Sequence, residues 1–157
     1  ASGRKWQICH FVFFMFLGQY RHTLDEKGRV AIPVKFRGAL TDGAVVTRGL
    51  DQSLFLYPRT QWIALAEKLA QLPLGQADTR AFARLMLAGA MEVELDSSGR
   101  ILLPEYLRTY GHLTKEMVVV GLYDRIELWD AAAWEAYAAR TEAEGNAIAE
   151  RLSTLGL

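Results

Sequence analysis

The feature that most constrains the fold of this chain is an internal duplication. The segment Leu24–Pro33 (LDEKGRVAIP) returns 71 positions later as Leu95–Pro104 (LDSSGRILLP), with Leu, Asp, Gly, Arg and Pro at the same spacing. The match resumes downstream with one extra residue, where Gly49-Leu50 corresponds to Gly121-Leu122. The chain is therefore a tandem of two homologous units, and this repeat decides the architecture before any single motif does.

The length of the chain, 157 residues, allows one large domain or two small ones. Each repeat covers only about 45–55 residues, and a unit of that size buries too little apolar surface to be secure alone. We therefore expect the two copies to share one hydrophobic core. The composition, 51% hydrophobic and 23% charged, is that of a globular protein. No segment is long and apolar enough to suggest a membrane span.

The duplication also predicts the domain organisation of a β-rich α+β protein. Residues 1–14 lie outside both copies, and we interpret them as a leader or added segment without ordered structure, with Met15 as the natural start. Residues 15–72 are assigned to the first unit, and residues 73–89 to a bridging helix. Residues 90–157 are assigned to the second unit with its C-terminal helix.

Within each unit, the pattern predicts two hairpins separated by a short helix and followed by a longer helix. The strand Phe16–Leu24 is expected to pair with Arg29–Ile32 across a tight turn at Lys27-Gly28, because glycine adopts positive φ readily. Ser98-Gly99 is expected to make the same turn before Arg100–Leu103. The other predicted elements are two strand pairs and three helices: 44–48 with 54–57, 117–120 with 126–129, and helices over 61–72, 76–89 and 131–144.

Each predicted turn carries an Asp-x-x-x-Arg element, Asp25 with Arg29 and Asp96 with Arg100. Residues four apart across a tight turn face each other, so the carboxylate can accept turn N–H groups and also hold the guanidinium. One interpretation is an ion pair that only sets the geometry of the turn. The other is an arginine oriented toward a planar acceptor, such as a guanine edge or a phosphate. The spacing alone leaves both open.

The charged residues are unevenly distributed along the chain, so the net charge alone does not describe its surfaces. The net charge is zero, with 18 basic and 18 acidic residues, which counts against a uniformly basic nucleic-acid-binding domain. Residues 21–37 nevertheless carry five basic and two acidic side chains, a net charge of +3. The basic residues of this segment are Arg21, Lys27, Arg29, Lys35 and Arg37. They could contact a phosphate backbone or form an ordinary solvated face. The second copy is less basic, since Ser98 and Glu105 replace Lys27 and Val34.

The sequence gives little support for catalysis, metal binding or a cofactor. The histidines show no ligand spacing, and neither a Gly-rich nucleotide loop nor a Gly-x-Ser-x-Gly elbow is present. Cys9 is the only cysteine, which excludes an internal disulfide and favours a reducing compartment. We therefore predict a protein that is not an enzyme and that needs no cofactor or metal, with a small hydrolase using Asp25 or Glu92 as a minor alternative.

Taken together, three features resemble the MraZ family of bacterial proteins. They are the segment Met15–Tyr20 (MFLGQY), the two Asp-x-x-x-Arg elements followed by an apolar run and Pro, and the turn Gly49–Asp51. The resemblance runs from Met15 to about Arg151. It implies two tandem AbrB-like swapped-hairpin units that form an internal pseudo-dimer, with flanking helices.

The resemblance also implies a function. The family suggests a cytoplasmic, nucleoid-associated transcriptional regulator that binds double-stranded DNA sequence-specifically, usually a repressor of the division and cell-wall gene cluster. It would bind repeated promoter boxes as a ring homo-oligomer, an octamer or dodecamer, which would convert weak single contacts into avid binding. The DNA-contacting residues would be Arg29 and Arg100, oriented by Asp25 and Asp96, with phosphate contacts from the remaining basic residues: Lys27, Arg21, Lys35 and Arg37.

A second hypothesis remains open beside the regulator. Related swapped hairpins also bind protein partners, as toxin antidotes do. In that case the chain would be a protein-interaction or scaffold ring without DNA binding, and its acidic, aromatic C-terminal helix would be the working surface. Salt-sensitive binding to a specific duplex separates the two hypotheses.

Overall fold

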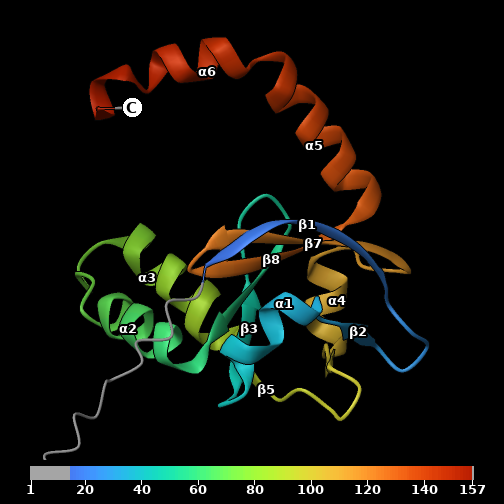
Figure 1. The fold of residues 1–157 in the computed structure, drawn as a ribbon. Helices are drawn as coiled ribbons and strands as arrows, with labels where there is room; N and C mark the ends of the chain where they lie inside the picture. Colours follow the sequence, from blue (N-terminus) through green and yellow to red (C-terminus); the bar gives the residue numbers. More distant parts are fainter. Residues whose placement is uncertain (1–14, 157) are drawn as a thin grey trace, which may run out of the picture.

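The computed structural model describes residues 15–156, so the predictions for residues 1–14 lie outside the described part of the chain. Its centre is a six-stranded antiparallel sheet in the order β1-β7-β8-β4-β3-β5, accompanied by a two-stranded ribbon, β2-β6 (Figure 1). The strands are β1 (Phe16–Thr23), β2 (Arg29–Ala31), β3 (Ala44–Arg48), β4 (Leu54–Pro58), β5 (Met91–Val93), β6 (Arg100–Leu102), β7 (Glu116–Tyr123) and β8 (Arg125–Asp130). The helical segments are α1 (Val34–Arg37), η1 (Gly38–Leu40), α2 (Arg59–Ala70), α3 (Ala77–Ala83), η2 (Arg84–Ala88), α4 (Glu105–Tyr110), α5 (Ala131–Ala143), α6 (Gly145–Arg151) and η3 (Ser153–Leu155).

The strands are exchanged between the two copies of the repeat. Strand β1 of the first copy pairs with β7 of the second, and β5 of the second pairs with β3 of the first. The ribbon β2-β6 and the central pair β4-β8 also join one copy to the other. This arrangement confirms the β-rich α+β fold in which the two units form an internal pseudo-dimer.

The predicted pairing of Phe16–Leu24 with Arg29–Ile32 is wrong, although the tight turn between them forms. Gly28 has φ of 82°, and the backbone N–H of Asp25 donates to the carbonyl of Arg29 at 2.9 Å. Beyond the turn the chain separates, with β1 joining β7 and β2 joining β6. An isolated two-stranded hairpin is only marginally stable, whereas exchange buries both strands in one core. The second copy makes the equivalent exchange.

The downstream hairpins agree with the prediction. Strand β3 pairs with β4, and β7 pairs with β8, both antiparallel and over the expected segments. The predicted helices over 61–72 and 131–144 correspond to α2 and α5, and the helix over 76–89 corresponds to α3 with η2. Local periodicity therefore located these elements to within a few residues.

The main hydrophobic core lies between the large sheet and the layer made by α1, α4 and the β2-β6 ribbon. It draws on both copies as expected, with equivalent buried residues such as Val30 and Ile32 in the first and Ile101 and Leu103 in the second. The opposite face of the sheet carries two smaller clusters, one under α2 and η2 and one under α5 (Figure 1). Within residues 15–156, none of the helices combines the length and apolar character that crossing a bilayer requires.

Candidate nucleic-acid interface

The first turn, residues 25–29, is organised by the carboxylate of Asp25. Its Oδ1 accepts hydrogen bonds from the backbone N–H groups of Lys27 and Arg29, both at 2.9 Å. Its Oδ2 accepts from Nε of Arg29 at 2.8 Å. A single carboxylate therefore fixes the turn backbone and the guanidinium together, as the Asp-x-x-x-Arg spacing predicts.

The second turn, residues 96–100, repeats these contacts. Oδ1 of Asp96 accepts from the backbone N–H groups of Ser98 and Arg100, both at 2.9 Å, and Oδ2 accepts from Nε of Arg100 at 3.0 Å. Gly99 has φ of 74°, so this turn also needs a residue that tolerates the left-handed region. The duplication has preserved the geometry of the element as well as its residues.

The two turns lie against each other and form one structural unit. The backbone N–H of Leu103 donates to the carbonyl of Gly28 at 2.8 Å, and that of Ile32 donates to Gly99 at 2.9 Å. In addition, Nη1 of Arg100 lies 3.7 Å from Oδ2 of Asp25. The Asp25 carboxylate therefore contacts the guanidinium groups of both turns and couples their orientations.

The arginines of the two turns remain open to solvent. The side chain of Arg29 is 29% exposed and that of Arg100 is 32% exposed. Each guanidinium is thus held by its aspartate in a side chain that remains partly accessible. Such an arrangement suits an arginine that approaches a planar acceptor with its orientation already fixed.

Both aspartates are ionised at neutral pH. The backbone N–H of Arg29 is the main cause that lowers the pKa of Asp25, and the N–H of Arg100 does the same for the pKa of Asp96. The neighbouring guanidinium groups lower both pKa values further. The carboxylates therefore keep their charge and can orient the arginines over the physiological pH range.

Arg37, which the sequence predicts as a phosphate contact, lies beneath the second turn. Its Nε donates to the carbonyl of Ile32 at 2.8 Å, and its guanidinium packs against Gly99. Arg37 belongs to the first copy but supports the turn of the second. Its charge lies close to the turns, while part of its side chain has a structural role.

Arg108 is a residue that sequence reasoning did not place in the site. It mirrors Arg37, since its Nε donates to the carbonyl of Leu103 at 3.0 Å and its guanidinium packs against Gly28. The signal was available, because Arg108 follows Arg37 by the same 71 positions as the rest of the repeat. Each copy therefore contributes an arginine that braces the turn of the other.

The other predicted basic residues fall on different surfaces. Lys27 is exposed within the first turn, and Lys35 is exposed on α1 in the layer that carries the ribbon. Arg21 lies across the sheet, where it forms an ion pair with Glu135 of α5. The alternation of side chains along β1 explains this separation, because Arg21 and Tyr20 point to opposite faces. The structure does not bring Arg21 to the turns, and its phosphate contact stays a prediction.

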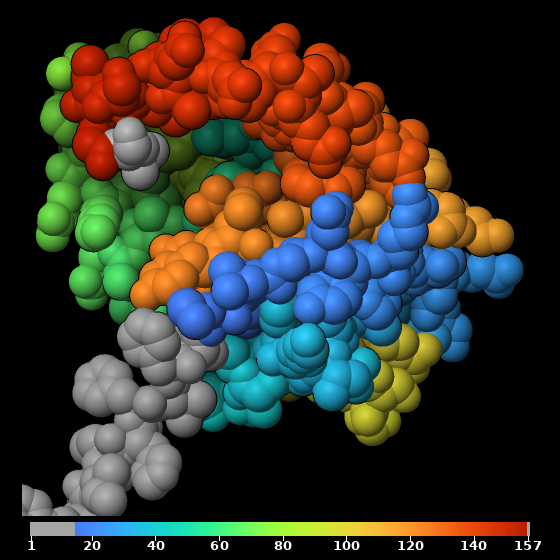
Figure 2. Space-filling model, turned by 45° about the horizontal axis from the view of Figure 1, so that its top comes forward, coloured from blue at the N-terminus to red at the C-terminus, as the bar shows by residue number. Residues whose placement is uncertain are grey.

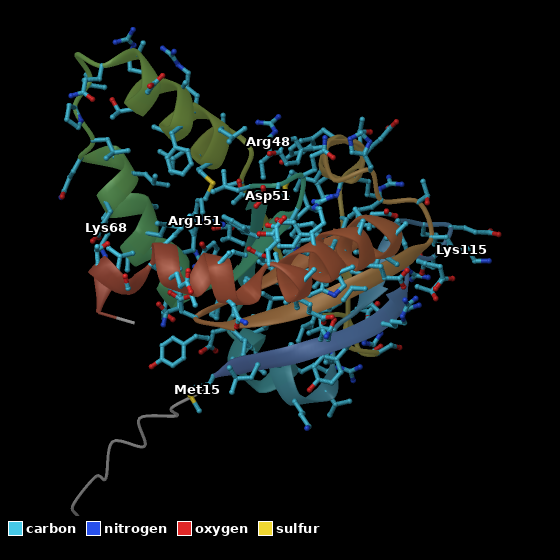
Figure 3. The ribbon with its side chains drawn as sticks, turned by 90° about the horizontal axis from the view of Figure 1, so that it is seen from above. Met15, Arg48, Asp51, Lys68, Lys115 and Arg151 are labelled. Carbon is cyan, nitrogen blue, oxygen red and sulfur yellow. The ribbon has the colours of Figure 1, made fainter. Side chains whose placement is uncertain are left out.

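Lys115 is a further cation that sequence reasoning missed. Its carbonyl accepts the backbone N–H of Leu24 at 2.7 Å, directly before the first turn, and its side chain is exposed. Figure 3 places Lys115 at one end of the molecule and Lys68 and Arg151 toward the other. Lys115 has no basic counterpart in the first copy, so the repeat could not reveal it.

The site consists of arginines, carboxylates and backbone groups. Across residues 15–156, no cluster of His, Cys, Asp and Glu side chains has the composition of a metal site. A pair of accessible, carboxylate-held guanidinium groups can bind phosphate oxygens or the O6 and N7 acceptors of guanine.

Comparisons with a family model and with individual proteins agree with each other. The family model described as "MraZ protein, putative antitoxin-like" matches the chain twice, over residues 15–85 and 86–155. A protein of Natranaerobius thermophilus named "Transcriptional regulator MraZ" is 49% identical over 138 residues, which cover 88% of this chain and 96% of the relative. Proteins of the same name from Desulforamulus reducens (46% identical, 90% of this chain and 99% of the relative) and Pediococcus pentosaceus (47%, 91% and 100%) are also similar.

Proposed function

The chain belongs to the MraZ family, and from this premise we propose that it is a transcriptional regulator that binds double-stranded DNA in a sequence-specific manner. The regulator role is supported by the names that its relatives carry. Those names also agree with the expectation that the chain is not an enzyme. The sequence-specific contact to DNA is supported by the geometry of the two turns.

In this proposal, Arg29 and Arg100 read base edges in the major groove, and Asp25 and Asp96 hold them in position. Each arginine that pairs with a guanine contributes about 1–3 kcal/mol of discrimination against the wrong base. The phosphate contacts are assigned to the remaining basic residues of the set: Lys27, Lys35, Arg37 and Arg21. Of these, Arg37 lies beneath the second turn and Arg21 pairs with Glu135 of α5.

The wider biological role is part of the same proposal. The family resemblance suggests a cytoplasmic, nucleoid-associated repressor of the division and cell-wall gene cluster. It also suggests a ring homo-oligomer, octamer or dodecamer, on repeated promoter boxes, since a second linked contact adds effective concentration without new chemistry. We also propose that the chain is divided into a first unit at residues 15–72, a bridging helix at 73–89 and a second unit at 90–157.

One observation carries the proposal: the Asp25 carboxylate lies 2.8 Å from Nε of Arg29 and 3.7 Å from Nη1 of Arg100. One carboxylate thereby holds two partly accessible guanidinium groups next to each other. The test is a gel shift of the full chain on the duplex immediately upstream of its own gene, beside a shuffled duplex of equal length. We expect a shift on the upstream duplex that Arg29→Ala weakens.

Arg140→Ala is the matched control, because Arg140 is exposed on α5 across the sheet from the turns. It removes the same charge from a different surface and should leave the shift unchanged. An Arg29→Ala protein with an unaltered circular dichroism spectrum and an unaltered shift would contradict the proposal.

The alternative of a protein-interaction or scaffold ring rests on one specific observation. The helix α6 and the segment η3 contain no buried residue, which leaves a long surface for a partner. A scaffold would show no salt-sensitive binding to the upstream duplex, so the same gel shift, repeated at two salt concentrations, decides between the two functions.

A further inference from the structure

The C-terminal arm, defined here as residues 142–156, arches over the body of the protein (Figure 1). Figure 1 shows α5 rising from the sheet and α6 turning back above it. Figure 2 shows the same segment as an arch over a hollow in the surface. No residue of α6 or η3 is buried, in contrast to the first part of α5, where Ala131 is buried and Trp134 packs on the sheet.

The arm carries an apolar stripe. Ile148 lies in α6, Leu152 caps its C-terminal end and Leu155 lies in η3. They follow one another at spacings of four and three residues, the spacing that is typical of one apolar helical face. Leu155 is 71% exposed, Leu152 is 36% exposed and Ile148 is half-buried. A short helix that begins at Gly145 is marginal in water without a packing partner. The stripe therefore needs a surface that the single chain does not supply.

The same chain carries an open apolar groove at another place. The groove lies between α2 and α3, with Leu69, Leu72 and Phe82 among its lining residues and Lys68 at its rim. Phe82 is 38% exposed. No residue of the arm lines this groove. One copy thus presents an unfilled groove and an unpartnered stripe at the same time.

The segments that carry the two surfaces have opposite net charges, while the lining of the groove itself holds one cation and one anion, Lys68 and Asp78. The arm has three acidic residues and one arginine between positions 142 and 156, a net charge of −2. Residues 59–89, which contain α2 and α3, have four basic and two acidic residues, a net charge of +2. Opposite net charge favours an encounter between the arm and the α2–α3 groove and disfavours contact between two arms.

We propose that the arm of one copy docks its stripe, Ile148, Leu152 and Leu155, in the α2–α3 groove of a second copy. Because the donated surface and the accepting surface differ, the contact is heterologous, and its repetition can close into a ring. This inference rests on the proposed ring oligomer and names the surfaces that form it. Lys68 of the groove lies toward the end of the molecule opposite Lys115, so docking leaves the turns free for DNA (Figure 3).

Two variants of the full chain test the contact from its two sides. Leu152→Glu with Leu155→Glu alters the arm, and Phe82→Glu alters the groove. All three positions are at least partly exposed, and none belongs to a buried cluster of the described residues. Size-exclusion chromatography with light scattering should give a multi-subunit mass for the parent and a monomer mass for each variant. A cooperative thermal unfolding transition and an unaltered circular dichroism spectrum verify that both variants fold, since the loss of assembly by itself lowers the midpoint of unfolding.

Mixing the two variants is the decisive measurement. The groove of the arm variant is intact and so is the arm of the groove variant, so each pair of molecules retains one functional contact. We expect a one-to-one heterodimer and no larger species. Leu74→Glu is the control, because Leu74 is 80% exposed at the tip between α2 and α3, and it should keep the parental mass.

Three outcomes would overturn the docking proposal: a monomeric parent, variants that keep the parental mass, or a mixture that stays monomeric. The last outcome would indicate an arm that docks on its own chain, whereas a groove variant that keeps the parental mass would indicate a contact between two arms. Binding of the same samples to a duplex with a single promoter box, measured by fluorescence anisotropy, separates this result from the proposed function. Monomers that still bind the box keep the regulator proposal intact whatever the assembly data show.

Discussion

The two turns of this protein have the same hydrogen-bond geometry but different charges around it. In each, one aspartate accepts two backbone N–H groups and one arginine Nε at 2.8–3.0 Å. The first turn has Lys27 at its tip, where the second has Ser98, and Glu105 lies after the second turn at the position that Val34 occupies after the first. The internal contacts of the element were kept after duplication, while its surface charge diverged.

This difference in charge between the two turns would favour one orientation of the proposed site on a DNA duplex over the reverse orientation. A pseudo-symmetric pair of arginines presents nearly the same groups after a half-turn, so the arginines alone do not decide which way the protein lies on a duplex. Phosphate contacts fix register and orientation without reading sequence. A first turn with Lys27 and a second turn with Ser98 would therefore orient the element, with the first turn on the side of stronger electrostatic attraction.

The largest expected effect tests whether both turns read bases. Arg29→Ala and Arg100→Ala should each weaken binding to a single-box duplex by about 1–3 kcal/mol, roughly 5- to 150-fold, because each removes one arginine–base contact. Fluorescence anisotropy at fixed salt, on the box and on a shuffled duplex, measures the loss of specific binding. Equal losses would support equivalent turns. A loss with Arg29→Ala alone would show that the second turn is only structural.

The next effect concerns the stability of the turns. Gly28→Ala should destabilise the fold by about 1–2 kcal/mol, the cost of placing an L-residue in the left-handed region. Gly99→Ala should cost more, because a Cβ there would overlap the guanidinium of Arg37, whereas at Gly28 the nearest atom of Arg108 is 3.0 Å away. Urea unfolding measures both. Gly75→Ala, with open space around it, is the control, and a larger loss for Gly28→Ala than for Gly99→Ala would contradict the bracing role of Arg37.

Features set by contacts between residues close in the sequence could be predicted from it, and features set by contacts between distant residues could not. The turns were predictable because the Asp25–Arg29 contact and the positive φ of Gly28 are set within five residues. The partners of β1 and β2 were not, because an alternating pattern states which face is buried and not which strand lies alongside. The resemblance to a known family supplied the exchange that periodicity could not. The contact of Arg37 with Gly99 depends on that exchange and was equally out of reach.

A smaller effect concerns the electrostatic difference between the turns. Lys27→Ser should reduce the slope of log K against log salt by about one, the value expected for one lost phosphate contact, and Ser98→Lys should increase it by about one. The double variant, which exchanges the two residues, should restore the original slope. Anisotropy titrations over a series of salt concentrations measure the slopes, with Arg140→Ser as the control on the opposite face. Unchanged slopes in both single variants would remove Lys27 from the interface.

The smallest effect concerns the protonation of the two aspartates. The folded-state pKa of Asp25 lies below its ordinary value of 3.8, so the unfolded chain binds more protons as the pH falls, and the stabilisation by this carboxylate declines with it. The stability difference between the parent and Asp25→Asn should therefore be constant at neutral pH and disappear once the pH falls through the folded-state pKa. Asp96→Asn should show the same trend with a smaller amplitude, because Asp25 also lies 3.7 Å from Arg100. Urea unfolding between about pH 7 and about pH 2 measures both differences, and a difference that grows on acidification would contradict the lowered pKa.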